Sequence, residues 1–431
     1  MTLPAAIEIV PSSAPLWARM TVPGSKSETN RALILAAHAP GPVTLRGALW
    51  SDDTWVMVEA LRVLGVSVEV ADDPAEPSNR TIHVAGGGRI ANGGAADAPL
   101  ELFVGNAGTA ARFLTAYVTL GRGAYRISGT TRMHERPQAA LFDALRQLGY
   151  QIDAPGNRLP AVVHGDGPHP AACEVSIADS SQFASALFLS SRPGGWRVTV
   201  TDVNADESPY VTMTERMLAA FPEAGDYTIE GDASSASYFV GANLVSRLRG
   251  GDSADSVVVV NAPRSGWQFD ERFAGYCDEV MAGRAPVTVS RLVDLGDSIM
   301  TAIVLAPLFP RPTRFVGLAR LRVQECDRVA ALFEGLTRCG ARVDMQGDEL
   351  LVHPSVLHGA TLETYDDHRV AMCFATLGLF VPGMVILNPS CVSKTFPDFW
   401  AKIAAPMPHG LGAVLRDPSR GCGLTAAELN V

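Results

Sequence analysis

Two cations, Lys26 and Arg31, open an apolar stretch in the segment "VPGSKSETNRALILAA", residues 22–37. The run that follows Arg31 is small and apolar on every side, which predicts a helix surrounded by protein. Burying a charge is costly unless it is compensated, so two cations at the mouth of such a helix indicate a bound anion. A helix N-terminus also offers unpaired N–H groups and a partial positive charge to an anion. The same pattern is compatible with an ordinary capped helix whose charges are solvated.

Other cations stand at Gly- and Ser-rich junctions instead of on amphipathic faces: Arg112, Arg132, Arg328, Arg369 and Lys394. Any one of them by itself is more often a surface charge or part of a structural ion pair. Together they predict a polyanionic ligand, such as one that carries a phosphate and carboxylates.

Two carboxylates are candidates for acid–base chemistry: Asp297 in "DLGDSIM" and Glu325 in "VQECDR". Glu325 stands between Arg322 and Arg328 in the sequence, where it would stay ionised or relay a proton beside a bound anion. The sequence contains no metal-ligand spacing, no arrangement typical of a serine or cysteine nucleophile and no nucleotide-binding glycine motif.

The composition limits the classes of protein to which the chain can belong. With 431 residues, 47% of them apolar, it is long enough for two or three core-rich domains. A net charge of -10 gives no general attraction to nucleic acid or to an anionic membrane. The seven cysteines are scattered and odd in number, which predicts free thiols in a reducing cytoplasm. No signal peptide is visible, so we expect a cytoplasmic protein.

One segment, residues 370–387, is apolar over a length that raises the question of a membrane span. Pro382 and Gly383 interrupt it near its end, and the charged sequence "YDDHR" adjoins it. We therefore expect a buried helix, a tight turn and a buried strand.

A polar cluster, an apolar helix, a Gly/Pro turn and a β-rich strand recur six times along the chain, as in an internal repeat. The repeats begin near residues 26, 106, 180, 232, 297 and 367. We expect Asp232 and Asp367 to cap their helices. A second, amphipathic helix runs into a short strand within three further segments: residues 54–70, 138–152 and 328–344.

This spacing predicts an α/β fold with two lobes of three repeats each. One lobe comprises residues 22–229, and the other combines residues 1–21 with residues 230–431. Two repeats look trimmed, around residues 221–234 and between the segments at residues 270–283 and 294–300. If the buried helices of both lobes point their N-termini to one place, the anion site lies in the cleft between the lobes.

Eight motifs together resemble the 3-phosphoshikimate 1-carboxyvinyltransferase family, also called 5-enolpyruvylshikimate-3-phosphate (EPSP) synthases. In chain order they are "PGSKSETNRAL", "GNAGTAAR", "RMHERP", "SSQF", "GDASSASYF", "RVQECDR", "YDDHRVAM" and "KTFPDFW". The resemblance implies a two-lobed, inside-out α/β barrel-like fold of six βαβαββ repeats. It implies transfer of the enolpyruvyl group of phosphoenolpyruvate to a ring hydroxyl, through a tetrahedral intermediate that loses phosphate. No metal or organic cofactor is implied.

The resemblance also implies roles for particular residues. The positions that match the phosphoenolpyruvate site are Lys26, Gly108, Arg132, Gln182, Arg328, Arg369 and Lys394. Asp297 resembles the base at the acceptor hydroxyl and Glu325 its proton-transfer partner, so the implied catalytic set is Lys26, Asp297, Glu325 and Lys394. The positions that match the acceptor site, besides Asp297, are Ser27, Arg31, Ser180, Ser181 and Tyr210.

Three positions depart from the family pattern in the acceptor site. Glu207 stands where a small hydroxyl residue is usual, Gln324 replaces a lysine, and Arg320 occupies a position that is commonly Asn or Glu. A carboxylate 4 Å from a phosphate costs about 4 kcal/mol per charge pair at an effective dielectric constant near 20. The departures therefore predict an acceptor whose 3-phosphate is bound weakly or is absent.

Three functions follow as alternatives. The chain is an enolpyruvyl transferase acting on 3-phosphoshikimate or a similar acid, as in aromatic amino acid biosynthesis. Alternatively, it is a relative from secondary metabolism that acts on unphosphorylated rings, as a transferase or as a dehydratase or lyase. Third, it is a binding protein that kept only the fold, although retention of the acid–base residues argues against this. We expect small-molecule substrates, no nucleic acid or membrane partner, and a monomer.

Overall fold

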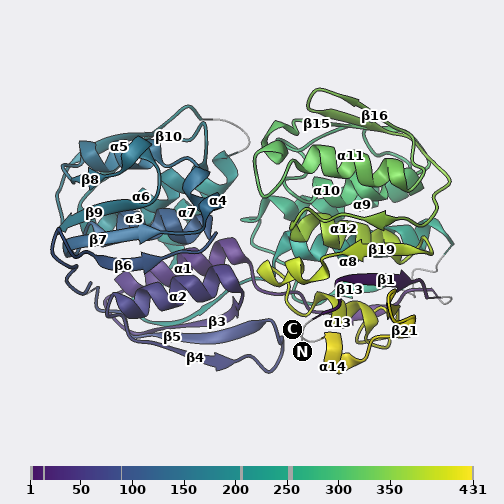
Figure 1. Ribbon diagram of the computed structural model, residues 1–431, viewed down its shortest axis with the longest axis horizontal. Helices are drawn as coiled ribbons and strands as arrows, with labels where there is room; N and C mark the ends of the chain where they lie inside the picture. The colour runs from purple at the N-terminus through teal and green to yellow at the C-terminus, as the bar shows by residue number, and fades with distance from the viewer. Residues whose placement is uncertain (1–2, 13–14, 89, 204–206, 251–255, 430–431) are drawn as a thin grey trace. The chain divides into compact units, whose positions relative to one another are not determined.

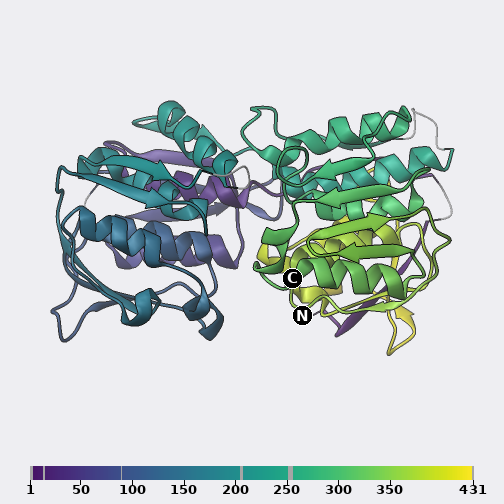
Figure 2. The same cartoon turned by 90° about the horizontal axis from the view of Figure 1, so that it is seen from above.

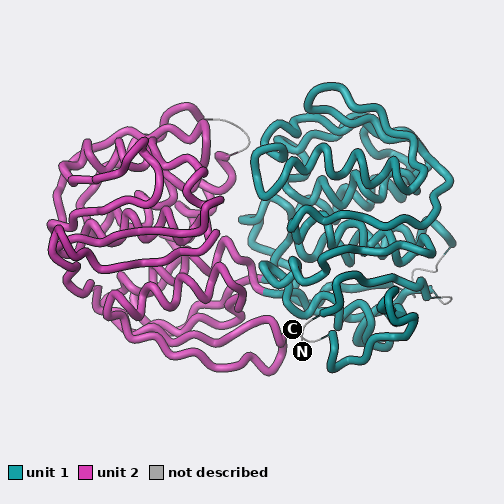
Figure 3. The backbone as a smooth tube through the Cα atoms, in the orientation of Figure 1, with its two compact units in different colours: residues 1–23, 231–431 teal, residues 24–230 magenta. Residues whose placement is uncertain are grey.

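The computed structural model describes residues 3–12, 15–88, 90–203, 207–250 and 256–429. The chain divides into two compact units, which are coloured separately in Figure 3. Unit 2 comprises residues 24–230, and unit 1 combines residues 1–23 with residues 231–431.

The centre of unit 2 is formed by three helices, α1 (Lys26–His38), α3 (Gly108–Val118) and α6 (Ser181–Gly194), which contact one another (Figure 1). Most residues of these helices are buried, including all of α3. Because apolar residues lie on most sides of these helices, the helices can be enclosed by protein without a broad exposed polar face. This confirms, for the three repeats of unit 2, the prediction that the first helix is surrounded by protein.

Three small sheets cover these helices. The first has the strand order β12 (Gly225–Thr228), β3 (Val43–Leu49), β5 (Asn79–Val84), β4 (Val68–Asp72). The second has the order β6 (Leu100–Phe103), β7 (Arg122–Ser128), β9 (Ala161–Asp166), β8 (Ile152–Asp153). The third pairs only β10 (Ala172–Ser176) with β11 (Arg197–Thr201). In each sheet the strand that follows the buried helix has a parallel neighbour, and in the two larger sheets it also has an antiparallel one.

Unit 1 repeats this plan around α8 (Ala233–Leu248), α10 (Ile299–Leu305) and α12 (His368–Gly378), which contact one another. One sheet has the order β14 (Thr288–Ser290), β15 (Thr313–Val316), β17 (Glu349–Val352), β16 (Val343–Gln346). The largest has the order β18 (Thr361–Leu362), β19 (Met384–Leu387), β1 (Ala6–Val10), β20 (Val414–Asp417), β21 (Cys422–Gly423). The third pairs β13 (Val257–Val259) with β2 (Ala18–Met20).

The N-terminal segment belongs to unit 1. Strand β1 lies antiparallel to β19 and β20, and β2 lies parallel to β13. In Figures 1 and 2 the dark purple strand β1 accordingly lies among the green and yellow elements of this unit.

Buried helices inside and small sheets outside define the inside-out α/β barrel fold, three repeats to a unit, as the sequence predicted. The two sheets with only two strands, β10–β11 and β2–β13, belong to the repeats that looked trimmed. The second helices are α2 (Asp52–Val63), α5 (Ala139–Gln147) and α11 (Arg328–Arg338), and each runs into the predicted short strand. Further helices are α4 (Thr131–Glu135), α7 (Ser208–Ala220), α9 (Arg272–Met281), α13 (Phe399–Ala404) and α14 (Ala426–Leu429).

The apolar segment 370–387 forms the end of α12, a turn and strand β19, as predicted. Gly383 has a φ of +80°, a backbone conformation that favours glycine and turns the chain into β19. Across the residues that the structure describes, no helix is long and apolar enough to cross a membrane.

A buried carboxyl group, Glu28, joins the first turn of α1 to the chain that follows β12. Its Oε1 accepts a hydrogen bond from the Tyr227 hydroxyl at 2.9 Å, and its Oε2 accepts one from the backbone N–H of Glu230 at 3.1 Å. Burial raises the pKa of Glu28 to about 7, although these two hydrogen bonds oppose the shift. The carboxyl group is therefore protonated in the folded chain at a pH where an exposed glutamate is ionised.

This group makes a testable contribution to stability. Because its folded-state pKa lies above the ordinary value of 4.5, it stabilises the fold fully below pH 4.5, and that contribution is lost as the pH rises through 7. The side chain of Glu28→Gln is neutral at every pH. Between pH 5 and pH 8 the free energy of unfolding of the wild type should therefore fall by about 2 kcal/mol more than that of Glu28→Gln. Urea denaturation at both pH values measures this difference.

Glu69→Gln is the matched control, because Glu69 is an exposed residue of the same unit. An equal loss of stability in the wild type and in Glu28→Gln over this range would contradict the prediction.

Candidate functional site

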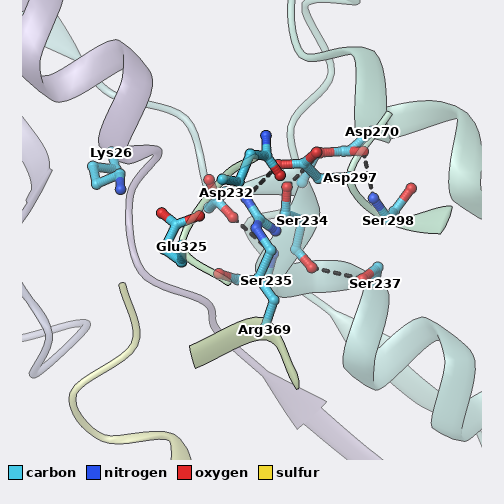
Figure 4. Close-up of polar contacts among 12 residues, drawn as sticks. Lys26, Asp232, Ser234, Ser235, Ser237, Asp270, Asp297, Ser298, Glu325 and Arg369 are labelled. Atoms are coloured by element: carbon cyan, nitrogen blue, oxygen red, sulfur yellow. Dashed lines mark hydrogen bonds and ion pairs between the residues drawn. The ribbon is translucent and has the colours of Figure 1, made fainter. Parts of the chain in front are cut away.

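In unit 1, the predicted base Asp297 is surrounded by arginines. It lies just before α10, and its Oδ1 accepts a hydrogen bond from Nη2 of Arg291 at 2.9 Å. Its Oδ2 lies 3.3 Å from Nη2 of Arg369 and 4.0 Å from Nη1 of Arg328 (Figure 4). Burial alone would raise the pKa of Asp297, but the charges of Arg369, Arg291 and Arg328 outweigh it, so the pKa lies well below the usual range. In this arrangement Asp297 is an ionised, weakly basic carboxylate.

Arg328 is the cation to which most of these acids are bound. Only 1% of its side chain is exposed, and Asp367 accepts from its Nε at 2.7 Å and from its Nη2 at 3.2 Å. Glu325 lies 2.9 Å from Nη2, and Gln324 Oε1 accepts from Nη1. Burial works against the charged form of Arg328, but Glu325, Asp367 and Asp297 outweigh it and raise its pKa.

Asp367 has a second role as the N-cap of α12, as predicted. Its Oδ1 accepts a hydrogen bond from the backbone N–H of Arg369 at 2.9 Å. Asp232 likewise caps α8, by accepting from the backbone N–H of Ser235 at 2.7 Å. One aspartate therefore holds Arg328 and also caps the first turn of α12, which contains Arg369.

Glu325 lies between two cations. One is Arg328, as expected from the sequence, but the other is Lys394 and not Arg322. Its partners are Arg328 and Lys394, whose Nζ lies 3.2 Å from Oε1. Arg322 instead contacts Asp348 at 2.7 Å and Asp327 at 2.9 Å. The expectation that Arg322 flanks Glu325 is therefore wrong, because the turn that precedes α11 directs Arg322 to the β16–β17 hairpin.

Two further charged residues of this cluster were not predicted, Arg291 and Asp270. Asp270 accepts from the hydroxyl of Ser234 and, at 2.8 Å, from the backbone N–H of Ser298 (Figure 4). Burial raises the pKa of Asp270, and the negative charge of Asp297 raises it further. No local pattern marks either residue: Arg291 follows a three-residue strand, and Asp270 lies in a segment that looked like a trimmed repeat.

In unit 2, Lys26 is the first residue of α1 and contacts a carboxylate that was also not predicted. Its Nζ lies 3.0 Å from Oδ2 of Asp53, at the start of α2. Asn30, one turn further along α1, donates to the Thr109 hydroxyl at 2.9 Å. This bond ties the first turns of α1 and α3 together, so that Lys26 and Gly108 belong to one polar region of the unit.

Gly108 begins α3 beside two guanidinium groups. A Cβ atom at this position would lie 2.7 Å from Nη2 of Arg136 and 2.8 Å from Nη1 of Arg112, so a larger residue would displace them. Arg132 lies in α4; 52% of its side chain is exposed, and Nη1 lies 2.8 Å from Oε2 of Glu135. The glycine in "GNAGTAAR" thus allows close approach of cations to the N-terminus of a buried helix.

Arg31 is enclosed by unit 2. It donates hydrogen bonds to the Thr214 hydroxyl at 2.7 Å, the Ser27 carbonyl at 2.9 Å, the Ser185 hydroxyl at 3.1 Å and the Tyr210 carbonyl at 3.3 Å. Burial lowers its pKa to about 10, although Tyr210 opposes the shift. These bonds join α1 to α6 and α7. The expected role of Arg31 in binding the acceptor stays a prediction.

The three altered positions lie in different places. Glu207 is buried at the start of α7, and its Oε2 accepts from the backbone N–H of Ser181 at 2.5 Å. Gln324 binds Arg328, so a lysine there would bring a like charge to that guanidinium. Arg320 lies in the 3-10 helix η4 (Ala319–Arg322).

A family model described as "EPSP synthase (3-phosphoshikimate 1-carboxyvinyltransferase)" matches residues 10–224 and 276–403 of this chain. This match and the relatives described below place the chain in the enolpyruvyl transferase class. The chain belongs to the EPSP synthase family.

Similar proteins support this membership over the whole chain. A 3-phosphoshikimate 1-carboxyvinyltransferase of Opitutus terrae is 38% identical and covers 94% of this chain and 98% of its own length. The Rhizobium etli protein of the same name is 37% identical, with 97% and 100% covered.

Two solved structures show the same fold. The EPSP synthase from Acinetobacter baumannii has a TM-score of 0.73 at 21% identity, and the match covers 96% of this chain and 100% of that one. The enolpyruvyl transferase NikO from Streptomyces tendae has a TM-score of 0.65 at 17% identity, with 96% and 99% covered.

Removing the charge of Asp297 should destabilise unit 1. Asp297→Asn removes the carboxylate that pairs with the buried Arg291 and the half-buried Arg369, so we expect a loss of about 3 kcal/mol in the free energy of unfolding. Urea denaturation at pH 7 measures this loss. Glu279→Gln, which breaks an exposed ion pair with Arg284 in the same unit, is the control and should leave the midpoint unchanged. Equal midpoints for the two variants would show that Asp297 does not neutralise the cluster.

Proposed function

We propose that this protein transfers the enolpyruvyl group of phosphoenolpyruvate to a hydroxyl of a shikimate-type ring acid and releases phosphate. The main support for this function is sequence similarity. The chain is 37–38% identical to proteins named 3-phosphoshikimate 1-carboxyvinyltransferase, over nearly the full length of both. The substrates are then two small anionic molecules, as the number of cations in the site suggests.

Phosphoenolpyruvate would have to share each cation that binds it with a carboxylate of the chain, or replace that carboxylate. Every cation proposed for this ligand has a carboxylate partner in the structure: Lys26 with Asp53, Arg132 with Glu135, Arg328 with Asp367 and Glu325, Arg369 with Asp297, and Lys394 with Glu325. These carboxylates keep the cations ionised and oriented before the ligand arrives. Gly108 and Gln182 are proposed to bind the same ligand.

This exchange would also activate the proposed base. Arg369 is the strongest of the three charges that hold down the pKa of Asp297. An anion bound to Arg369 and Arg328 offsets their positive charge, which moves the pKa of Asp297 back toward its ordinary value. Binding of phosphoenolpyruvate would thus make Asp297 able to accept the proton of the acceptor hydroxyl.

The remaining steps follow from the proton balance. As the hydroxyl oxygen bonds to C2 of phosphoenolpyruvate and loses its proton to Asp297, the methylene carbon gains a proton from the Glu325–Lys394 pair. The tetrahedral intermediate then expels phosphate, and the new methyl group returns a proton to restore the double bond. Ser27, Ser180, Ser181, Arg31 and Tyr210 are proposed to hold the acceptor while this occurs.

Two alanine variants test the proposed phosphoenolpyruvate site. Removing one charge-assisted contact should weaken phosphoenolpyruvate binding about 10- to 100-fold in Arg132→Ala or Lys394→Ala. Isothermal titration with phosphoenolpyruvate gives the affinity, and phosphate release with shikimate or 3-phosphoshikimate gives the activity. Because Arg132 is half-exposed, its variant should keep the wild-type melting temperature.

Arg126→Ala is the matched control, since Arg126 is a partly exposed arginine of the same unit that pairs with Glu101. Unchanged affinity for phosphoenolpyruvate in both test variants would contradict the proposed site. Failure of the wild type to release phosphate with any shikimate-type acid would contradict the proposed function.

A further inference from the structure

The buried carboxylate of Glu207 lies against the N-terminus of α6. Only 7% of Glu207 is exposed, and its Oε2 accepts from the backbone N–H of Ser181, the first residue of the helix. The next two N–H groups also have partners within the chain: Gln182 N–H donates to Oγ of Ser180 at 3.2 Å, and Phe183 N–H donates to the Ser180 carbonyl at 3.4 Å. The chain therefore supplies its own anion, and its own acceptors, at this helix N-terminus.

The carboxylate is not used to cap the helix to which Glu207 belongs. Glu207 is the N-cap residue of α7, yet its side chain makes no cap hydrogen bond there, and its backbone carbonyl accepts from the N–H of Tyr210 at 3.1 Å. The side chain instead reaches across to α6. A residue that served only α7 would turn its oxygen toward its own first turn.

The helix that carries Glu207 is also tied to α6 by a chain of buried hydrogen bonds. The Thr214 hydroxyl of α7 donates to the Ser185 hydroxyl of α6 at 2.9 Å, and Arg31 donates to Thr214 at 2.7 Å and to Ser185 at 3.1 Å. Because these bonds fix α7 against α6, the backbone of Glu207 is held where its carboxylate reaches Ser181.

We infer that Glu207 selects the acceptor by occupying the anion position at α6, so that the ring presents a neutral hydroxyl there and not a phosphate. This inference rests on the proposed function, which places Ser180 and Ser181 at the acceptor. An ionised carboxylate can only accept hydrogen bonds, so it repels a phosphate and accepts a hydrogen bond from a hydroxyl. The substrate class that fits is an unphosphorylated, polyhydroxylated ring carboxylic acid, such as shikimate.

Binding measurements on the full chain test this assignment without requiring turnover. Isothermal titration gives the affinity of the wild type, Glu207→Ser and Glu207→Gln for shikimate and for 3-phosphoshikimate. We expect the wild type to bind shikimate more tightly. In Glu207→Ser, which removes the charge and frees the Ser181 N–H, the ratio of affinities should shift toward 3-phosphoshikimate by about 100-fold, as expected when a like charge leaves a partly buried site.

Glu207→Gln separates selection from helix capping, because its amide oxygen can still accept from Ser181 while the charge is gone. Its ratio should shift in the same direction by at least about tenfold, at a melting temperature close to that of the wild type. Glu174→Gln, an exposed carboxylate of the same unit, is the control and should leave the ratio unchanged.

Two results would overturn the inference: tighter binding of 3-phosphoshikimate than of shikimate by the wild type, or an unchanged ratio in both Glu207 variants. A lower melting temperature with an unchanged ratio would mark Glu207 as a cap of α6 only. If the ratio shifts as expected but no acid supports phosphate release from phosphoenolpyruvate, the selection by Glu207 stands and the proposed transfer fails.

Discussion

The buried ion pairs of Arg328 are the interaction on which the charged cluster of unit 1 depends. A guanidinium with 1% exposure is tolerable only because Asp367 and Glu325 bind it directly and Asp297 lies 4.0 Å away. Asp367 in turn caps α12, and Glu325 in turn holds Lys394. The helix geometry and the positions of the cations are thus parts of one network, which is why removal of a single carboxylate affects both.

The same principle describes the polar residues of unit 2. Lys26 is matched by Asp53, and the N-terminus of α6 is matched by Glu207. On the proposed function, an anionic ligand would meet cations and helix ends that carboxylates of the chain already satisfy, and it would have to share these groups or replace the carboxylates. Replacement is favourable where the internal carboxylate is mobile or partly exposed, and it is unfavourable where the carboxylate is buried and its backbone is fixed. Glu325, which is 23% exposed, and Glu207 illustrate the two cases.

Much of the architecture could be predicted because its signals are local. The apolar helices, the amphipathic second helices, the helix–turn–strand of residues 370–387 and the caps at Asp232 and Asp367 each depend on a few neighbouring residues. The eight motifs likewise place the chain in its family, since their order and spacing are specific in combination. Two repeats could be recognised as trimmed because their sequences are short. In the structure, each of these repeats has a sheet of only two strands, β10–β11 or β2–β13.

The sequence by itself determined the repeat, the buried helices and the residue types at their ends, because 3.6-residue periodicity and capping act over a single turn. Only the tertiary structure decided which charges meet. Asp270, in the 3-10 helix η2 (Phe269–Glu271), lies close enough to feel the charge of Asp297. Lys394 and not Arg322 becomes the second partner of Glu325, and Glu207 reaches Ser181 across 26 positions of the chain. Ion pairing depends on distance in space and on burial, and neither quantity can be read from separation along a sequence.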